Sequence, residues 1–377
     1  MKRINIVDLP EDLLVEILYR LPKAFDLARL RCTSKGLNAL IKKYKRLAKS
    51  QIIMLIDFRV YLASIDLNGV HDNNNVVKVT SQLSLKDPLS TTSPKEVDIS
   101  EVFHYDGLLL CTTKDDRLVL WNPCSGETRW MIKPVGPSFK NFNCYALGKS
   151  SCNKYKILRM RQHGNGYSKC LVEYEIYDFT SDSWRVLGET SDWSIHWLKH
   201  CGMSVNGNTY WLASNNVPVW QNDFLLSFDF STERFESETR WMIKPVGPSF
   251  KNFNCYALGK SSCNKYKILR MRQHGNGYSK CLVEYEIYDF TSDSWRVLGE
   301  TSDWSIHWLK HCGMSVNGNT YWLASNNVPV WQNDFLLSFD FSTERFERTI
   351  LKDFKIDTLV ALVGTWGLNN QIGLAYL

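Results

Sequence analysis

A stretch of 110 residues occurs twice in this chain of 377 residues without a single change. Residues 127–236 recur as residues 238–347, at an offset of 111. Ordinary repeat proteins diverge between units, so this identity indicates either a recent tandem duplication or an error in sequence assembly. Each junction follows a strand–turn–strand pattern of the same kind. We therefore expect the second copy to continue the architecture of the first with little disturbance.

The repeated block reads as short strands separated by tight turns, and helical periodicity is almost absent from it. Asn206-Gly207 lies between two apolar runs and is the strongest short hairpin signal there. The strands expected in and just before the first copy cover residues 107–113, 117–121, 155–160, 172–179, 184–187, 203–205, 209–213, 225–230 and 234–235. Short strands at regular spacing predict an all-β sandwich, barrel or propeller.

A recurring phrase favours the propeller among these. An apolar strand runs into an Asp or Asn turn, and an aromatic residue starts the next strand. The phrases are Leu120-Trp121-Asn122-Pro123, Ile176-Tyr177-Asp178 and Phe228-Asp229-Phe230. Successive antiparallel hairpins in blades have this pattern, and each copy then supplies roughly two blades.

Outside the block the pattern is less regular. Residues 51–65 predict two strands with a turn near Asp57, and the polar residues 71–98 predict a loop. Residues 359–363 and 372–377 predict two final strands.

The first 50 residues follow a helical pattern instead. Leu13, Leu14, Ile17, Leu18 and Leu21 recur at helical spacing. Asp8 suits a cap, Pro10 suits the first turn and Pro22 ends the helix. Two further short helices are expected over residues 24–30 and 34–44.

Three short helices bury little apolar surface, and the apolar positions here exceed what so small a core needs. One interpretation is a minor helical cap on the following domain. The other is a docking module whose surplus apolar face is covered by another protein.

The same stretch resembles an F-box, a family that docks on the Skp adaptor of an SCF (Skp–cullin–F-box) ubiquitin ligase. The residues in register are Leu9-Pro10, Leu13, Ile17, Leu21-Pro22, Leu30, Arg31-Cys32, Ser34-Lys35 and Leu40-Ile41. Many F-boxes carry a Trp two residues after the Lys, whereas this chain has Leu37, so a large aromatic contact is lost. The resemblance assigns adaptor binding to Leu9, Pro10, Leu13, Ile17, Leu21, Pro22, Leu27, Leu30, Lys35 and Leu40.

The β region resembles the kelch-like, F-box associated domain of a large plant F-box family. The matching pieces span residues 121–130, 177–186, 207–211 and 228–235, although the paired glycines of true kelch repeats are missing. The architecture expected is a small all-α F-box over residues 1–50. A mainly-β, propeller-like domain of antiparallel hairpins follows over residues 51–377 and contains both copies.

Charge and cysteine content constrain partners and compartment. Residues 1–50 hold twelve Lys and Arg against five Asp and Glu, a charge of +7, whereas the rest of the chain carries −1. The basic excess lies after the expected third helix, and a solvated linker explains it without nucleic acid. The 11 cysteines include no CxxC pair, which suits reduced thiols in the cytoplasm or nucleus. No secretory signal and no apolar run long enough to span a membrane is expected.

Catalytic and metal motifs are weak. His196, His200 and Cys201, repeated as His307, His311 and Cys312, lack a second ligand cluster, so a loop or a packed aromatic segment is preferred over a zinc site. Asp115-Asp116 reads as a hairpin tip and Gly164-Asn165-Gly166 as a turn. Trp193, Trp197 and Trp220 fall in irregular stretches and fit core packing better than partner binding.

Together these features predict a substrate-recognition subunit of an SCF-type ligase, without catalytic residues, cofactor or metal. Its expected partners are a Skp-type adaptor, cullin through that adaptor, and an unknown target protein. One alternative is a stand-alone β-propeller binding module in which the F-box is only a cap. Others are a propeller enzyme or lectin-like domain, and a duplicated gene product without a stable β domain.

Overall fold

The fold is known from a computed structural model, which describes part of the chain in detail. The described residues are 9–20, 36, 51–66, 76–88, 96–123, 125–131, 142–163, 170–195, 202–205, 208–216, 223–237, 252–263, 265–274, 281–306, 314–316, 319–327, 334–351 and 359–366. The chain divides into two compact units. The first contains Met1–Met131, Tyr256–Gln273 and Gly277–Leu377, and the second contains Ile132–Cys255 with His274–Asn276.

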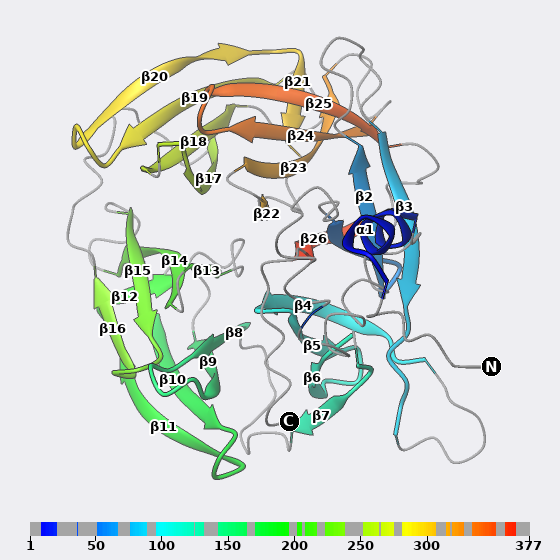
Figure 1. Ribbon diagram of the computed structural model, residues 1–377. Helices are drawn as coiled ribbons and strands as arrows, with labels where there is room; N and C mark the ends of the chain where they lie inside the picture. The colour runs from blue at the N-terminus through cyan, green and yellow to red at the C-terminus, as the bar shows by residue number, and fades with distance from the viewer. Residues whose placement is uncertain are drawn as a thin grey trace. The chain divides into compact units, whose positions relative to one another are not determined.

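The described residues form helix α1 (Glu11–Arg20) followed almost entirely by strands (Figure 1). The observed order confirms the predicted fold class of a small helical part before a mainly-β domain of antiparallel hairpins. The second and third expected helices, over residues 24–30 and 34–44, lie almost wholly outside the described residues, as does the last expected strand, 372–377.

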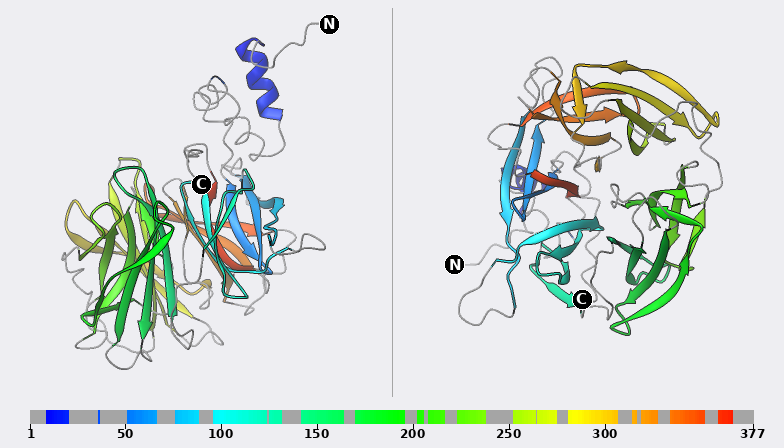
Figure 2. Two further views of the ribbon diagram at one scale, coloured as in Figure 1. Left: turned by 90° about the horizontal axis from the view of Figure 1, so that it is seen from below. Right: turned by 180° about the vertical axis from the view of Figure 1, so that it is seen from behind.

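The second unit contains two antiparallel sheets built from the first copy of the repeat. The four-stranded sheet contains β8 (Phe142–Lys149), β9 (Tyr155–His163), β10 (Leu171–Asp178) and β11 (Ser183–Thr190), paired in that order. The five-stranded sheet contains β12 (Trp193–Ile195), β13 (Met203–Val205), β14 (Asn208–Asn215), β15 (Asp223–Asp229) and β16 (Arg234–Ser237). In both views of Figure 2 the green strands of this unit run side by side within their sheets.

The second copy repeats this arrangement, mainly within the first unit. One sheet contains β17 (Asn252–Lys260), β18 (Tyr266–His274), β19 (Leu282–Asp289) and β20 (Ser294–Thr301). The next strands are β21 (Trp304–Ile306), β22 (Met314–Val316), β23 (Asn319–Asn326), β24 (Asp334–Asp340) and β25 (Arg345–Leu351). Identical sequences therefore form equivalent strands twice.

The two copies differ at their last strand. Strand β16 ends at Ser237 and has no partner on its outer side among the described residues. Strand β25 runs on to Leu351 and pairs in parallel with β3 (Val76–Leu83), through Ile350 opposite Val76. The difference arises where the repeat ends, because Thr349, Ile350 and Leu351 extend the strand in the second copy, whereas polar residues follow Glu236 in the first.

The parallel pair makes one nine-stranded sheet from the two ends of the chain. From β3 the sheet continues through β2 (Arg59–Asp66) and β1 (Gln51–Ile56) to β26 (Leu359–Trp366). Strand β1 lies between β2 and β26, antiparallel to both. The strands that follow the N-terminal helix are thus completed by the strands near the C-terminus.

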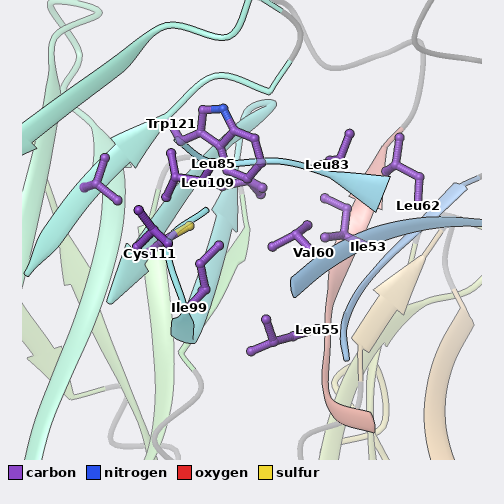
Figure 3. Close-up of a cluster of buried hydrophobic side chains, with 12 residues drawn as sticks. Ile53, Leu55, Val60, Leu62, Leu83, Leu85, Ile99, Leu109, Cys111 and Trp121 are labelled. Atoms are coloured by element: carbon purple, nitrogen blue, oxygen red, sulfur yellow. The ribbon is translucent and has the colours of Figure 1, made fainter. Parts of the chain in front are cut away.

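A separate sheet of the first unit contains β4 (Ile99–Tyr105), β5 (Leu108–Thr113), β6 (Leu118–Trp121) and β7 (Thr128–Met131). Its apolar side chains share one buried cluster with those of β1, β2 and β3 (Figure 3). The cluster consists of Ile53, Leu55, Val60, Leu62, Leu83, Leu85, Val97, Ile99, Leu109, Cys111, Val119 and Trp121. It joins the N-terminal strands to the next sheet through apolar burial.

Two hairpins of this unit have two-residue turns with positive φ at both positions. Asp57 and Phe58 have φ of 46° and 61°, and Asp106 and Gly107 have φ of 52° and 80°. This geometry matches the right-handed twist of paired strands. The turn expected near Asp57 is confirmed, as are the hairpin strands flanking residues 114–116 and Asn206-Gly207.

The loop expected over residues 71–98 is wrong. Strand β3 occupies residues 76–83, and an isolated bridge joins Lys86 to Glu96. The polar residues of β3 do not give a strand pattern in the sequence. The segment is a strand because it pairs with β2 and β25. The sequence likewise does not predict strands β4, β8 and β12, whereas β7 contains Trp130, where an aromatic strand start is expected.

Within each copy the two sheets are joined by a polar cluster around one glutamate. In the first copy Glu233 Oε1 lies 2.6 Å from Lys156 Nζ, and its other oxygen accepts from Arg185. In the second copy Glu344 lies 2.7 Å from Lys267 Nζ and 2.6 Å from Arg296. We call these the Glu233 and Glu344 clusters. Each ties the turn after β15 or β24 to the neighbouring four-stranded sheet.

Steric fit accompanies the charge contacts. A Cβ on Gly148 of β8 would lie 2.1 Å from the ring of Phe230, which is fully buried. The equivalent distance from Gly259 to Phe341 is 2.0 Å. Glycine is required at both positions because the ring occupies the place of the side chain.

A buried amide also contributes to the contact between the two sheets of the first copy. Asn216 Nδ2 donates to the carbonyl oxygens of Cys170, Ser191 and Trp193 at 2.8, 2.9 and 3.1 Å. Asn216 is only 2% exposed, so its replacement by an apolar residue would leave carbonyl groups buried without partners.

We predict that Gly148→Ala destabilises the protein by about 1–3 kcal/mol, because the new Cβ overlaps a ring that cannot leave its site. Denaturant unfolding followed by tryptophan fluorescence measures the change. Gly259→Ala should have a similar effect, and Glu236→Ala, at an exposed position of β16, should have almost none. Equal stability of Gly148→Ala and the unaltered protein would contradict the packing described here.

We predict that acid weakens the contact between sheets. Burial opposes ionisation of Glu233 and Glu344, but hydrogen bonds and charges from the Lys and Arg partners outweigh it and hold both pKa values below the ordinary 4.5. A carboxyl whose pKa is lower in the folded than in the unfolded state stabilises the folded protein at any pH above its unfolded-state pKa. That stabilisation is lost as the pH falls through the folded-state pKa.

Unfolding midpoints measured between pH 7 and pH 3 should therefore fall steeply below about pH 4.5. The double variant Glu233→Gln, Glu344→Gln should start less stable and show a shallower fall. An unchanged slope in that variant would assign the acid sensitivity to other groups.

Candidate functional site

Helix α1 carries the one part of the expected docking site that the structure describes. The helix begins at Glu11, directly after Pro10, whose carbonyl oxygen accepts from the backbone N–H of Leu14 at 3.0 Å. Glu11 and Asp12 place negative charge at the positive end of the helix dipole. Proline before the first turn and acidic residues within it explain why the helix starts here.

The apolar residues of α1 divide between two environments. Leu14 is buried, with 7% of its surface exposed, whereas Leu13 and Ile17 are 52% and 38% exposed. Residues four apart lie on one face of a helix, so Leu13 and Ile17 form an exposed apolar stripe, which we call the α1 stripe. Leu9 is half-buried and Pro10 is exposed beside the start of the helix.

Leu9, Pro10, Leu13 and Ile17 are the described members of the expected adaptor site. The other members lie outside the described residues: Leu21, Pro22, Leu27, Leu30, Lys35 and Leu40. Their contribution to adaptor binding stays a prediction. The exposed α1 stripe is what a helical docking module needs, because its apolar face is available to a second protein.

The charged residues of the first copy are arranged as ion pairs across strands. Arg159 on β9 lies 3.0 Å from Glu175 on β10, and both side chains are largely buried. His163 Nε2 lies 2.8 Å from Glu173 of the same strand pair. A hydrogen bond from His163 is the main reason that the pKa of Glu173 lies below its ordinary value. Both pairs join neighbouring strands of the same sheet, and the lowered pKa keeps the Glu173 carboxylate ionised at neutral pH.

The hairpin tip at Asp115 is also held internally. Asp115 accepts from Thr113 Oγ1 and lies 2.7 Å from Arg117 Nε, and the hydrogen bond from Thr113 is the main cause that lowers its pKa. The expectation that this pair of aspartates forms a turn is confirmed by the hairpin of β5 and β6.

Metal and aromatic candidates fall mostly outside the described residues. Among the residues that the structure describes, no group of three or more His, Cys, Asp or Glu could hold a metal ion. His196, His200, Cys201, Trp197, Trp220 and the repeated His307, His311 and Cys312 are not among them. Trp193 is described and packs its ring against Phe235, with centroids 5.0 Å apart, as core packing requires.

No helix within the described ranges is long and apolar enough to cross a membrane. Seven described cysteines are thiols that take part in no disulfide, and five of them are buried. Burial raises the pKa of Cys111, which keeps its thiol protonated and unreactive.

Comparison with known families assigns both parts of the chain. The F-box domain family matches residues 6–49, which include the α1 stripe. The family described as the F-box associated beta propeller domain matches residues 51–238 and again residues 236–363. The second match begins two residues before the second copy and contains all of it, so both copies fit the same family.

Two curated relatives come from Arabidopsis thaliana. A protein named as an F-box protein, At4g10190, is 55% identical over 244 residues, which cover 62% of this chain and 64% of the relative. The F-box/kelch-repeat protein At3g16740 is 40% identical over 265 residues, with the same shares of 62% and 64%. The chain thus spans a little less than two thirds of the length of these relatives.

Among solved structures, the Aleuria aurantia lectin in complex with α-methyl-L-fucoside is similar over 81% of this chain and 95% of the lectin. The identity is 12% and the TM-score is 0.41, values at which the likeness carries no inference about sugar binding. The assignment rests on the two sequence families and on the arrangement of helix and sheets. The chain belongs to the F-box associated β-propeller family and carries an F-box domain ahead of its β domain.

Proposed function

We propose that this protein is the substrate-recognition subunit of an SCF-type ubiquitin ligase. The observation that carries the proposal is the α1 stripe inside the segment that matches the F-box domain. Leu14 is buried within the protein, while the half-exposed Leu13 offers an apolar contact to a partner. The helix can therefore bind a second protein without losing its own packing. That face is the part of the F-box that would dock on a Skp-type adaptor, and cullin would join through the adaptor.

The β domain takes the second task in this proposal. It is a kelch-like propeller domain that holds a target protein close to the ubiquitin-transfer machinery. Catalysis by positioning needs no active site in this chain, and the carboxylates described above are engaged in ion pairs and turns. The adaptor residues proposed are Leu9, Pro10, Leu13, Ile17, Leu21, Pro22, Leu27, Leu30, Lys35 and Leu40. The compartment proposed is the cytoplasm or nucleus, which suits free thiols.

A stand-alone β-propeller binding module is the competing function. It would use the same β domain but leave the α1 stripe without a partner. Adaptor binding separates the two, because a module of this kind has no reason to bind a Skp-type protein.

We predict that Leu13→Asp abolishes co-purification with a Skp-type adaptor while the protein stays folded. The substitution places a charge where apolar surface is to be buried, a loss of several kcal/mol in binding. Leu13 is half exposed in the free protein, so its thermal stability should change little. Glu16→Ala, at an exposed position of the same helix, is the matched control and should bind normally.

The outcome decides between the functions. Binding by the unaltered chain and by Glu16→Ala, but not by Leu13→Asp, supports the ligase role. Absence of binding by all three soluble proteins would favour the stand-alone module.

We further predict that Leu37→Trp strengthens adaptor binding by about tenfold, since a buried aromatic contact contributes on the order of 1.4 kcal/mol. Surface plasmon resonance with immobilised adaptor measures the affinity, and Leu37→Ala should weaken it. Equal affinities for Leu37→Trp and the unaltered chain would show that this position lies outside the interface.

A further inference from the structure

The contacts that join the two sheets of each copy are chemically interchangeable between the copies. Lys156 Nζ lies 2.6 Å from Glu233, and Lys267 Nζ lies 2.7 Å from Glu344. Both lysine side chains are nearly buried, with 11% and 12% exposed. Nothing in the chemistry of Lys156 therefore distinguishes Glu233 from Glu344.

The other contacts of the interface repeat with the same geometry. The backbone N–H of Ile195 donates to Gln162 Oε1 at 3.0 Å, and that of Ile306 donates to Gln273 Oε1 at 3.0 Å. Further equivalent pairs are Ser151–Ser231 with Ser262–Ser342, Asn216–Cys170 with Asn327–Cys281, and Gly148–Phe230 with Gly259–Phe341. The steric fit and the hydrogen bonds are as interchangeable as the charges.

Distance along the chain is then the factor that selects a partner. Lys156 and Glu233 are 77 residues apart, and Glu344 is a further 111 residues away. Loop-closure entropy depends only logarithmically on length, so the contact with Glu233 is favoured over that with Glu344 by about fourfold before the sheets form. A second molecule supplies the same surface at a rate that rises with protein concentration.

We propose that two molecules of this chain exchange sheets during folding and form a dimer. The β8–β11 sheet of one molecule docks on strands β21–β25 of the other, in place of the partner's own β17–β20 sheet. The displaced β17–β20 sheet docks on strands β12–β16 of the first molecule. The ion pair, the glycine–phenylalanine fit and the hydrogen bond from Ile195 or Ile306 are then each remade with an equivalent partner from the other copy. Exchange of identical elements is a route to dimers that costs little free energy, and it is a characteristic misassembly of repeat proteins.

Charge reversal can be arranged to favour either pairing. The cross-copy variant combines Lys156→Glu with Glu344→Lys. Pairing within a copy then brings two glutamates together at one cluster and two lysines at the other. Exchange between molecules places the new glutamate at position 156 beside the new lysine at position 344, and Lys267 beside Glu233. Each cluster then contains one pair of opposite charges. Arg185 and Arg296 are 58% exposed and influence the balance less.

The matched control combines Lys156→Glu with Glu233→Lys, both in the first copy. It has the same number of substitutions and the same net charge as the cross-copy variant. Here pairing within a copy keeps opposite charges together, whereas exchange between copies brings like charges together. The two full-length variants and the unaltered chain are unfolded in urea and refolded at low and high protein concentration. The dimer fraction is measured by size-exclusion chromatography with light scattering.

We expect the dimer fraction of the unaltered chain to rise with refolding concentration. The cross-copy variant should give at least fivefold more dimer than the matched control, and its dimer should unfold at a similar temperature to the control monomer. The proposal is overturned if the unaltered chain and both variants refold only as monomers. It is also overturned if the cross-copy variant is a monomer as stable as the control, since the exchange would then lie within one chain.

Discussion

The ion pair between a turn glutamate and a lysine on the neighbouring sheet joins the two sheets of each copy. Glu233 sits in a turn with φ of 57°, where its backbone N–H donates to Asp229 at 2.7 Å. This geometry directs the carboxylate toward Lys156 and Arg185 of the adjacent sheet. Because the groups are partly buried, the pair is screened less than a surface ion pair. The same arrangement around Glu344 shows that the second copy repeats the contacts between sheets as well as the strands.

Local patterns in the sequence predicted the hairpins well. Asp57-Phe58 and Asn206-Gly207 lie between apolar runs, and turn chemistry at such places constrains register without help from distant residues. Helix α1 could be predicted equally well from the sequence, because the acidic residues, the proline and the leucine spacing all indicate the same start. These features need only a few consecutive residues to be recognised.

Long-range features could not be predicted in this way. Strand β3 contains Lys78, Thr80 and Gln82, and it is a strand because β2 and β25 lie on either side of it. The role of Glu233 has no local signal either, since its partners lie 77 and 48 residues away. Of the candidate adaptor site, helical spacing identified the α1 stripe but could not distinguish exposed Leu13 from buried Leu14, which depends on the packing of the whole segment.

The parallel pair between β25 and β3 has a consequence for synthesis of the protein. Val76 leaves the ribosome about 270 residues before its partner Ile350, which at 5–20 residues per second is a delay on the order of tens of seconds. During that time β3 has an unpaired outer edge that can recruit other strands. Strand β1 waits still longer for β26. Nascent chains of this protein therefore pass through a stage in which their earliest strands lack their final partners, and that stage lengthens by the time needed to translate one additional copy.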